Sequence, residues 1–256
     1  MNLSNLVRGL LNLQKEINLN LLPSQGLFYK DDFKMWIKRA DMEDIIEYEY
    51  NFIKDNLSVV INKLKRIVEK NTTFTTGYSF NDIRSIDVVF IFLEIVKFTN
   101  AKPIKLSYQD EEEGIEKTID FDSNFFNYFK IEDGLMSKYD KESKEFIVDG
   151  YKYSLPTIGA ENCLTRFLVS KSSLPGSSRY NNFTYDFTYF LGGRNHLHFS
   201  EIENLIQIFN FDMDSSEKGK VKSVVRLFSP LQKYSLIKDD KVIDINSKIN
   251  LEDIWK

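Results

Sequence analysis

The pattern of apolar residues near the start of the chain changes its period within the first forty positions. Residues 3–10 place leucine and valine at i, i+3, i+4 and i+7, which predicts a short amphipathic helix. Residues 17–21 then alternate Ile or Leu with Asn, and apolar residues alternate again over residues 33–37. A period of two is typical of a strand with one buried face, so we expect two extended segments here.

The segment LPSQGLFY, residues 22–29, separates these two extended segments. Pro23 disfavours helical backbone at Leu22 and has the φ that the second position of a turn needs. Gly26 can adopt the positive φ with which such turns often end. We therefore expect a bend, after which residues 27–29 restart an apolar strand. The candidate structural or interface residues are Leu22, Pro23, Ser24, Gly26, Phe28 and Tyr29.

The next sixty residues favour helices. Residues 41–70 show helical periodicity with an interruption at 54–56, where Asp55 or Asn56 is a suitable N-cap, and this predicts two helices. Residues 71–82 are expected to form a loop. Residues 85–100 are apolar except for Asp87, Glu94 and Lys97, and a helix that is apolar on most sides is a buried one.

Two extended stretches follow. Residues 102–121 predict a β-hairpin whose turn is formed by residues 110–114, with a shift in register between its arms. A single extended segment is expected at 145–151. The sequence then favours helices at about 158–171, 181–191, 200–210 and 214–228, the third with a capping box of Ser200 and Glu203. A short strand at 242–245 and a turn at 251–255 complete the chain.

These elements predict a helix-rich α+β fold with a small antiparallel sheet in the N-terminal half and a helical C-terminal half. We expect a boundary between an α+β region, residues 1–153, and a helical region, residues 154–256. The chain has 256 residues, which is long enough to bury a large core without a disulfide or a metal.

Charge argues against two classes of partner. The chain carries 34 Lys and Arg against 38 Asp and Glu, a net charge of −4, so we expect neither nucleic acid nor an anionic membrane as a partner. No signal peptide and no apolar stretch long enough to cross a bilayer is apparent, which predicts a soluble protein. The lone Cys163 permits no intramolecular disulfide, as is usual in a reducing cytoplasm.

Candidate chemistry is sparse. His196 and His198 could ligate zinc, but no further ligand follows at metal-site spacing, and a solvated loop is the better interpretation. Cys163 stands among apolar residues of an expected helix and is interpreted as a core residue. The acidic run 110–113 lacks the calcium-loop pattern and is expected to lie in water. The aromatic run 183–190 is expected to pack mainly in the core, with some rings available to a partner. We expect no enzyme, no cofactor and no bound metal.

LPSQGLFY resembles the Leu-Pro-Ser-x-Gly-x-x-Tyr opening of the baseplate hub proteins of T-even-type contractile-tailed bacteriophages. Three further stretches are similar to that family: the acidic helix DMEDIIEYEY, the loop with Gly77, Ser79, Asp82 and Ile83 together with the apolar helix after it, and the ending VIDINSKINLEDIWK. The resemblance covers most of the chain and is weakest between about 125 and 155. Some relatives have cysteine pairs in the hairpin region that could hold zinc. This hairpin has no cysteine, so the resemblance implies no metal site in this chain.

The resemblance implies a non-enzymatic part in phage tail assembly. It implies a structural subunit of the baseplate hub, a virion component made in the host cytoplasm, whose partners are other baseplate or tail proteins. A hub assembly factor that is not retained in the virion is the alternative within the family. From another class, a zinc-dependent phage enzyme that uses His196 and His198 is a further alternative.

Overall fold

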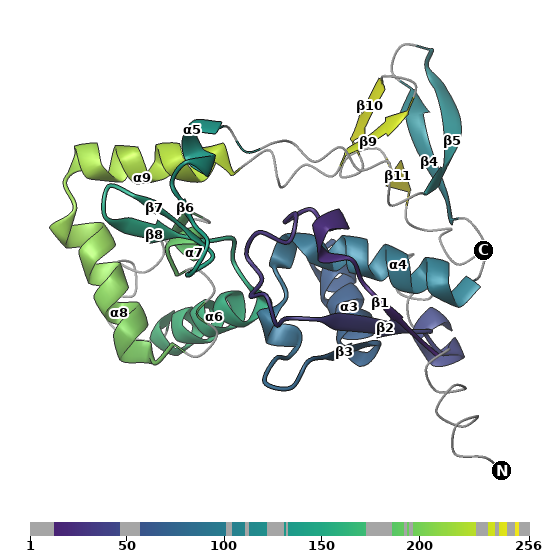
Figure 1. Ribbon diagram of the computed structural model, residues 1–256, viewed down its shortest axis with the longest axis horizontal. Coiled ribbons are helices and arrows are strands. Elements are labelled where there is room, and N and C mark those ends of the chain that lie inside the picture. Colours follow the sequence, from purple (N-terminus) through teal and green to yellow (C-terminus); the bar gives the residue numbers. More distant parts are fainter. Residues whose placement is uncertain are drawn as a thin grey trace.

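The computed structural model shows an α+β fold in which all the described strand pairs are antiparallel (Figure 1). The structure describes residues 13–46, 57–100, 104–110, 113–121, 131, 133–172, 186–191, 194, 197–228, 235–238, 241–244 and 249–250. The predicted helix at 3–10 and turn at 251–255 lie outside these residues. The predicted fold class is confirmed.

The first lobe consists of a small sheet and two long helices. Its strands, in the order β1-β2-β3, are β1 (Gln14–Glu16), β2 (Met35–Lys38) and β3 (Thr72–Phe74). Helices α3 (Leu57–Lys70) and α4 (Val88–Asn100) pack beside the sheet (Figure 1). Alternation in β2 directs Met35 and Ile37 into the core.

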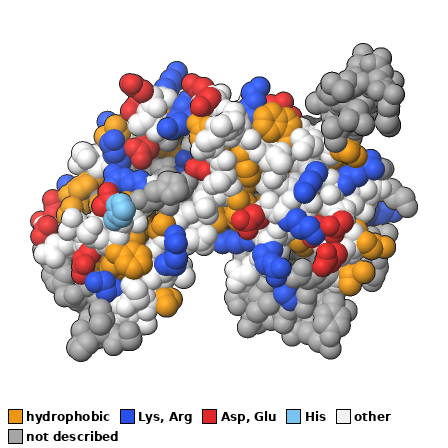
Figure 2. Space-filling view, turned by 90° about the horizontal axis from the view of Figure 1, so that it is seen from below, with side chains coloured by type: hydrophobic (Ala, Val, Ile, Leu, Met, Phe, Trp, Pro, Cys, Tyr) orange, Lys and Arg blue, Asp and Glu red, His pale blue; other side chains and the backbone are white. Residues whose placement is uncertain are grey.

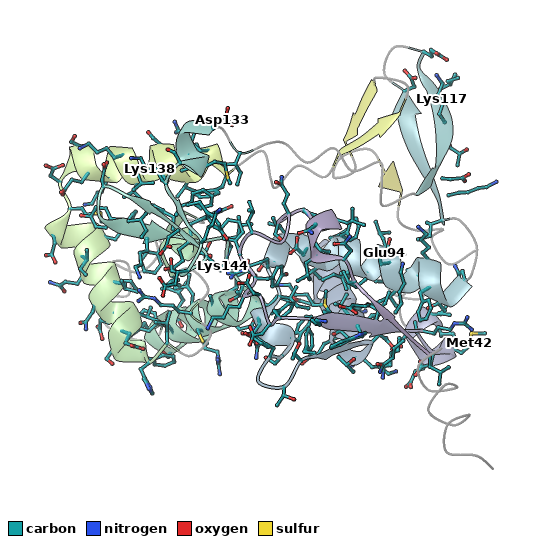
Figure 3. All side chains as sticks on the ribbon, viewed as in Figure 1. Met42, Glu94, Lys117, Asp133, Lys138 and Lys144 are labelled. Atoms are coloured by element: carbon teal, nitrogen blue, oxygen red, sulfur yellow. The ribbon has the colours of Figure 1, made fainter. Side chains whose placement is uncertain are left out.

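Helix α4 is the centre of the first lobe. Nearly all of its first nine residues are buried, as its apolar sequence predicts. Among these buried residues Glu94 alone is charged, and its carboxylate lies inside the first lobe (Figure 3). Its Oε2 lies 2.6 Å from the Lys15 Nζ of β1, and this ion pair compensates part of the cost of burying the charge.

The second lobe is mostly helical and includes a three-stranded meander, β6-β7-β8. Its elements are α5 (Asp133–Met136), β6 (Tyr139–Asp140), β7 (Glu145–Val148), β8 (Tyr151–Tyr153), α6 (Ile158–Ser172), α7 (Asp186–Leu191), α8 (Phe199–Gln207), a π-helical turn (Ile208–Asp212) and α9 (Ser215–Leu227). The described parts of the four predicted C-terminal helices are helical. Their apolar faces form a second buried cluster with the meander.

A third part, here called the arm, projects from the first lobe (Figure 1). It contains the predicted hairpin, β4 (Ile104–Asp110) and β5 (Ile115–Phe121), and three strands from the end of the chain. These are β9 (Ser235–Lys238) paired with β10 (Lys241–Asp244), and β11 (Ile249–Asn250) paired with β4. The hairpin pairs regularly from Ile104↔Phe121 to Asp110↔Ile115, so the predicted register shift is wrong.

Two local predictions near the N-terminus are also wrong. Residues 19–21 form a 3₁₀ turn and not a strand, because the Asn18 side chain accepts a hydrogen bond from the Asn20 N–H and so stabilises a turn. Residues 27–29 belong to a series of turns, and the strand begins only at Met35.

Three further predictions differ from the structure. The predicted loop 71–82 contains β3, whose residues pair with β2 across the sheet. The single extended segment at 145–151 is a hairpin, because Asp149 and Gly150 both adopt positive φ and form the tight turn that Asp-Gly favours. Helix α8 begins at Phe199 after His198, whose backbone N–H donates to Glu201, so the predicted capping box at Ser200 lies two residues too late.

The two buried clusters divide the chain differently from the expected regions 1–153 and 154–256. Ile131, Phe146 and Tyr153 contribute to the second cluster, although they precede residue 154. In the other direction, Ile158 packs in the first cluster. The packing boundary therefore lies between the lobes at the segments around residues 28, 86 and 158, and not at one point of the sequence.

Candidate functional site

The LPSQGLFY segment is a compact series of turns at the border between the lobes. Its backbone bonds run from Gln25 N to Leu22 O, from Leu27 N to Ser24 O and from Tyr29 N to Gly26 O. Gln25 and Gly26 have φ of 57° and 71°. Such backbone is readily accessible to glycine and costly for residues with a Cβ, which explains the glycine of the motif.

Phe28 and Tyr29 are neighbours in sequence but pack in different lobes. Phe28 is 2% exposed and lies in the second cluster, with its ring centroid 5.7 Å from that of Phe146. Tyr29 is 5% exposed and lies in the first cluster, stacked on Phe33 at 4.5 Å. The motif thus anchors one turn in both cores, and these two rings are core residues of the folded chain.

The carboxylate of Asp87, just before α4, binds the motif at two points. Its Oδ1 accepts a hydrogen bond from the Ser24 N–H at 2.8 Å, and its Oδ2 accepts one from the Tyr29 hydroxyl at 2.7 Å. The same hydroxyl accepts a hydrogen bond from the Arg84 N–H at 3.0 Å. All of these groups are buried, so each bond also removes the cost of an unpaired polar atom.

The side chain of Arg84 connects the motif to the second lobe. Its Nη1 donates to the Leu155 carbonyl at 2.7 Å and to Ser154 Oγ at 3.2 Å, and its Nη2 donates to the Phe28 carbonyl. The guanidinium carbon lies 5.6 Å from the Phe28 ring centroid and 5.8 Å from that of Tyr29. A planar cation with several donors is well suited to hold several acceptors in this way.

Backbone bonds beside Arg84 extend this connection. Ser85 N donates to Pro156 O, and Ile158 N donates to Ile83 O, both at 3.0 Å. Residues 84 and 157 form an isolated antiparallel bridge between these bonds. We call the group of Ser24, Tyr29, Arg84, Asp87 and Ser154, with these backbone bonds, the junction. It joins segments that lie far apart in the sequence.

Burial dominates the electrostatics of the junction. It raises the pKa of Asp87 to about 6, although the bonds from Ser24 and Tyr29 and the nearby Arg84 oppose the rise. Burial, together with the charge of Asp87, raises the pKa of Tyr29 well above its usual value. At neutral pH the junction therefore holds an ionised carboxylate beside a guanidinium, with Tyr29 protonated as a donor.

Two ion pairs also connect the lobes. Lys65 on α3 places its Nζ 3.3 Å from Glu161 Oε2 on α6. Lys144, between β6 and β7, places its Nζ 2.7 Å from Asp31 Oδ1 in the turn that follows the motif (Figure 3). On the face shown in Figure 2, charged side chains of both signs are intermixed and a notch separates the two halves. An ion pair of this kind that is open to solvent contributes little to stability. The connection between the lobes therefore depends mainly on the buried junction.

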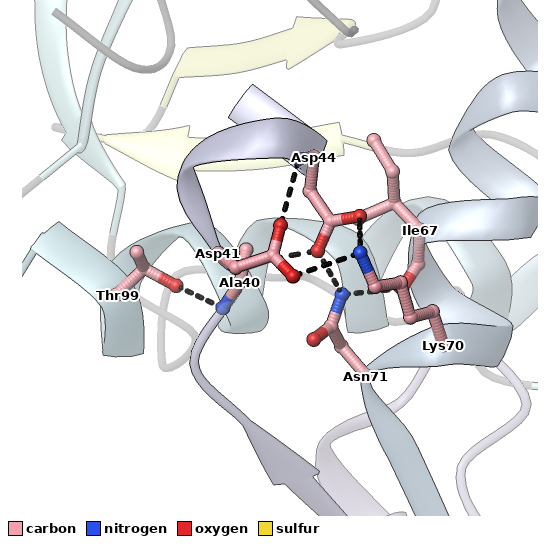
Figure 4. A network of polar contacts seen from close by, with 7 residues as sticks. All are labelled: Ala40, Asp41, Asp44, Ile67, Lys70, Asn71 and Thr99. Carbon is pink, nitrogen blue, oxygen red and sulfur yellow. Dashed lines mark hydrogen bonds and ion pairs between the residues drawn. The ribbon is translucent and has the colours of Figure 1, made fainter. Parts of the chain in front are cut away.

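The acidic stretch DMED, the second motif of the resemblance, organises a polar network in the first lobe (Figure 4). Asp41 and Asp44 exchange backbone-to-carboxylate hydrogen bonds at the start of a helical segment, residues 42–46. The Lys70 Nζ lies 2.8 Å from Asp41 and 2.9 Å from Asp44, and Asn71 donates to Asp44. The Lys70 ammonium, as a hydrogen-bond donor, lowers the pKa of Asp41.

The third motif, the loop with Gly77, Ser79, Asp82 and Ile83, leads directly into the junction. Ser79 and Asp82 form a capping box around a 3₁₀ turn, and Gly77 has φ of 94°. Ile83 is fully buried and precedes Arg84. The first and third motifs are separated by about fifty residues in sequence, yet they meet through Tyr29 and Arg84.

The other candidate residues lie away from the junction. Cys163 is buried on α6, which confirms it as a core residue. His198 is exposed at the start of α8, and His196 lies outside the described residues. Within the described ranges, no group of three or more His, Cys, Asp or Glu lies close enough to hold a metal ion.

Two further expectations can be compared with the structure. Asp110 is buried and paired with Lys117 at 2.8 Å, so the expectation that the whole acidic run lies in water is wrong for this residue. Phe187 and Tyr189, from the aromatic run, are fully buried in the second lobe. Residues 183–185 of that run lie outside the described part of the chain.

Sequence reasoning did not identify Arg84 as a site residue, and it marked Asp87 only as a polar exception in an apolar helix. The available signal was a pair of opposite charges three residues apart, beside a segment with almost no other polar positions. A charge at such a position needs a partner, because burial of an unpaired charge is costly. The sequence does not indicate which partner, since the contacts span 55 to 71 residues.

Comparison with known proteins finds no matching family model, curated protein or solved structure. Among the helices of the described ranges, none is long and apolar enough to cross a membrane.

Proposed function

We propose that this protein is a non-enzymatic structural subunit of the baseplate hub of a contractile-tailed bacteriophage. It acts through contacts with other baseplate or tail proteins during tail assembly. In this proposal it is made in the host cytoplasm and is retained in the virion as part of the tail. The sequence resemblance motivates this proposal, and contacts between the resembling motifs in the folded chain support it.

The observation that carries the proposal is the contact between two of these motifs. Tyr29 of LPSQGLFY accepts the backbone N–H of Arg84, which directly follows the loop that ends at Ile83. If these two stretches resembled the family only by chance, no contact between them in the folded chain would be expected. Motifs that together hold one buried junction have a shared structural reason for their residue types.

The junction also supports a structural role by its chemistry. The Asp87 carboxylate accepts bonds from Ser24 and Tyr29, and the Arg84 guanidinium donates to carbonyls of Phe28 and Leu155. The Asp87 bonds fix the motif on the first lobe, and the Arg84 bonds connect it to the second. A subunit that contacts several neighbours needs such a fixed relation between its surfaces, because ordering them on assembly would cost binding free energy.

The test is the protein content of purified phage particles. Tails washed at high salt are analysed by mass spectrometry, with a known tail subunit as the reference for stoichiometry. The proposal predicts peptides of this chain at a fixed, near-integral ratio to that subunit. Their absence from complete particles, with the protein present in infected cells, would show instead a hub assembly factor that is not retained.

A second measurement addresses the alternative of a zinc-dependent enzyme that uses His196 and His198. Metal analysis of the purified full-length protein is expected to find no zinc at stoichiometric amounts. One zinc per chain that is lost on changing His196 and His198 to alanine would contradict the proposal. That result would support the zinc-dependent enzyme.

A further inference from the structure

The arm presents a strand edge beside a concentration of negative charge. Strand β5 pairs with β4 along its whole length. Within the described part of the chain, no strand pairs with the other edge of β5. Alternate N–H and C=O groups of an edge strand point away from its neighbour and can pair with another extended chain.

The β4–β5 hairpin of the arm carries an excess of negative charge. Residues 104–121 contain six carboxylates and two lysines, and this excess of four negative charges equals the net charge of the whole chain. Four of the carboxylates are consecutive at the hairpin turn, residues 110–113. The β4–β5 hairpin would therefore attract a basic segment, whereas on the face of the molecule shown in Figure 2 side chains of the two signs are intermixed.

The two faces of β5 differ in character. Glu116, Thr118 and Asp120 alternate onto one face and are all exposed, with Lys105 opposite Asp120. On the other face Ile115 is 50% exposed, and the Lys117 ammonium is held by Asp110 and Glu113 at 2.8 and 2.7 Å (Figure 3). A lysine at an edge normally hinders the approach of another strand, but this one is bound to the turn of its own hairpin.

We propose that the outer edge of β5 binds an extended segment of another protein in which basic and apolar residues alternate. The backbone of that segment adds a strand to the sheet β11-β4-β5. Its lysine or arginine side chains lie beside Glu116 and Asp120, and its apolar side chains continue the face of Ile115. This mode combines main-chain pairing with side-chain selection, as in other cases of strand addition. The inference concerns the arm alone and stands without the hub assignment.

The experiment uses the full-length protein and a blocked peptide of alternating lysine and valine as the probe. Hydrogen exchange of the amides of residues 115–121 is measured with and without the peptide. A matched peptide with N-methyl groups at alternate positions keeps the charge and the side chains but cannot pair along its backbone. The proposal predicts slower exchange in β5 with the first peptide only, and weaker binding as the ionic strength rises from about 0.05 M to about 0.5 M.

Two double variants test the charge selection. Glu116→Lys with Asp120→Lys is expected to weaken peptide binding about tenfold, because two attractions become repulsions. Glu69→Lys with Glu142→Lys makes the same change of net charge at exposed positions outside the arm and is expected to change binding less than about twofold.

Three results would overturn the inference. One is unchanged exchange in β5 with the lysine–valine peptide, and another is equal protection by the N-methylated peptide, which would show charge attraction alone. The third is protection of β5 that rises with protein concentration in the absence of peptide. That last result would assign the edge to a second copy of this chain.

Discussion

The hydroxyl of Tyr29 donates a hydrogen bond to the Asp87 carboxylate 2.7 Å away, and both groups are buried at the border between the two lobes. The same hydroxyl accepts the Arg84 N–H. One phenol oxygen thus satisfies a buried charge and a buried backbone donor together. Loss of this oxygen leaves two groups without a partner, which is costlier than loss of a bond at the surface.

Tyr29→Phe is therefore expected to lower the free energy of unfolding by about 2–3 kcal/mol. Urea unfolding at neutral pH measures this change. Tyr78→Phe is the matched control, because the Tyr78 hydroxyl donates to the Asp32 carboxylate near the surface. We expect a loss of no more than about 1 kcal/mol for the control. Equal losses in the two variants would contradict the assigned role of Tyr29.

Replacement of Arg84 tests the connection between the lobes. Arg84→Lys keeps the charge but cannot reach the Phe28 and Leu155 carbonyls and Ser154 Oγ at once. We expect a loss of about 2–4 kcal/mol in the free energy of unfolding. Arg226→Lys, at an exposed position of α9, is expected to change it by less than about 0.5 kcal/mol. Equal stability of Arg84→Lys and the wild type would exclude this role.

Gly26 and Gly219 offer a pair of glycines with opposite expectations. Gly26 has φ of 71°, and an added Cβ would lie 3.0 Å from Asn20 Oδ1, so Gly26→Ala is expected to destabilise the protein by about 1–2 kcal/mol. Gly219 lies within α9 with open space around it, so Gly219→Ala is expected to stabilise the protein by up to about 1 kcal/mol. Thermal or urea unfolding of both variants gives the comparison. A Gly26→Ala protein as stable as the wild type would show that the turn does not need this backbone.

The raised pKa of Asp87 gives the stability a defined pH dependence. Its pKa is about 6 in the folded protein, against an ordinary value of 3.8, so the folded protein retains the proton to higher pH than the unfolded chain does. The stabilisation that Asp87 contributes is therefore present below about pH 4 and is lost as the pH rises to about 6. In Asp87→Asn this dependence is absent.

The measurement is the difference in the free energy of unfolding between the wild type and Asp87→Asn across this range. We expect the wild type to lose about 2–3 kcal/mol relative to the variant between about pH 4 and pH 7. Carboxylates with lowered pKa values, such as Asp41 and Asp140, cancel in this difference because both proteins contain them. A difference that does not vary with pH would contradict the assignment.

The sequence predicted those elements whose residues reveal their burial by periodicity. Met35 and Ile37 alternate in β2, and α4 is apolar on nearly every side, so both were found. The 3₁₀ turn at residues 19–21 was missed because a local bond from Asn20 N to Asn18 outweighs the alternation. The hairpin at 145–153 contains the Asp-Gly turn that favours such a structure, but its second strand, Tyr151–Tyr153, is too short to show an alternation of its own.

The candidate site was predicted in part. Its N-terminal turn was found from Pro23 and Gly26, whose backbone preferences are local. The partners of that turn were not found, because Arg84 and Asp87 reach it only in the folded chain. Sequence periodicity can mark a position as buried, but it cannot say which buried polar groups meet.

Hydrogen exchange of the native protein tests most directly whether the junction makes the two lobes one cooperative unit. The slowest amides of α4 in the first lobe are compared with those of α6 and α9 in the second, under conditions where exchange reports the free energy of opening. We predict equal opening free energies in the wild type and a separation of at least about 1 kcal/mol in Arg84→Lys. Unequal values in the wild type, unchanged by Arg84→Lys, would show that the lobes open independently and that the junction does not unite them.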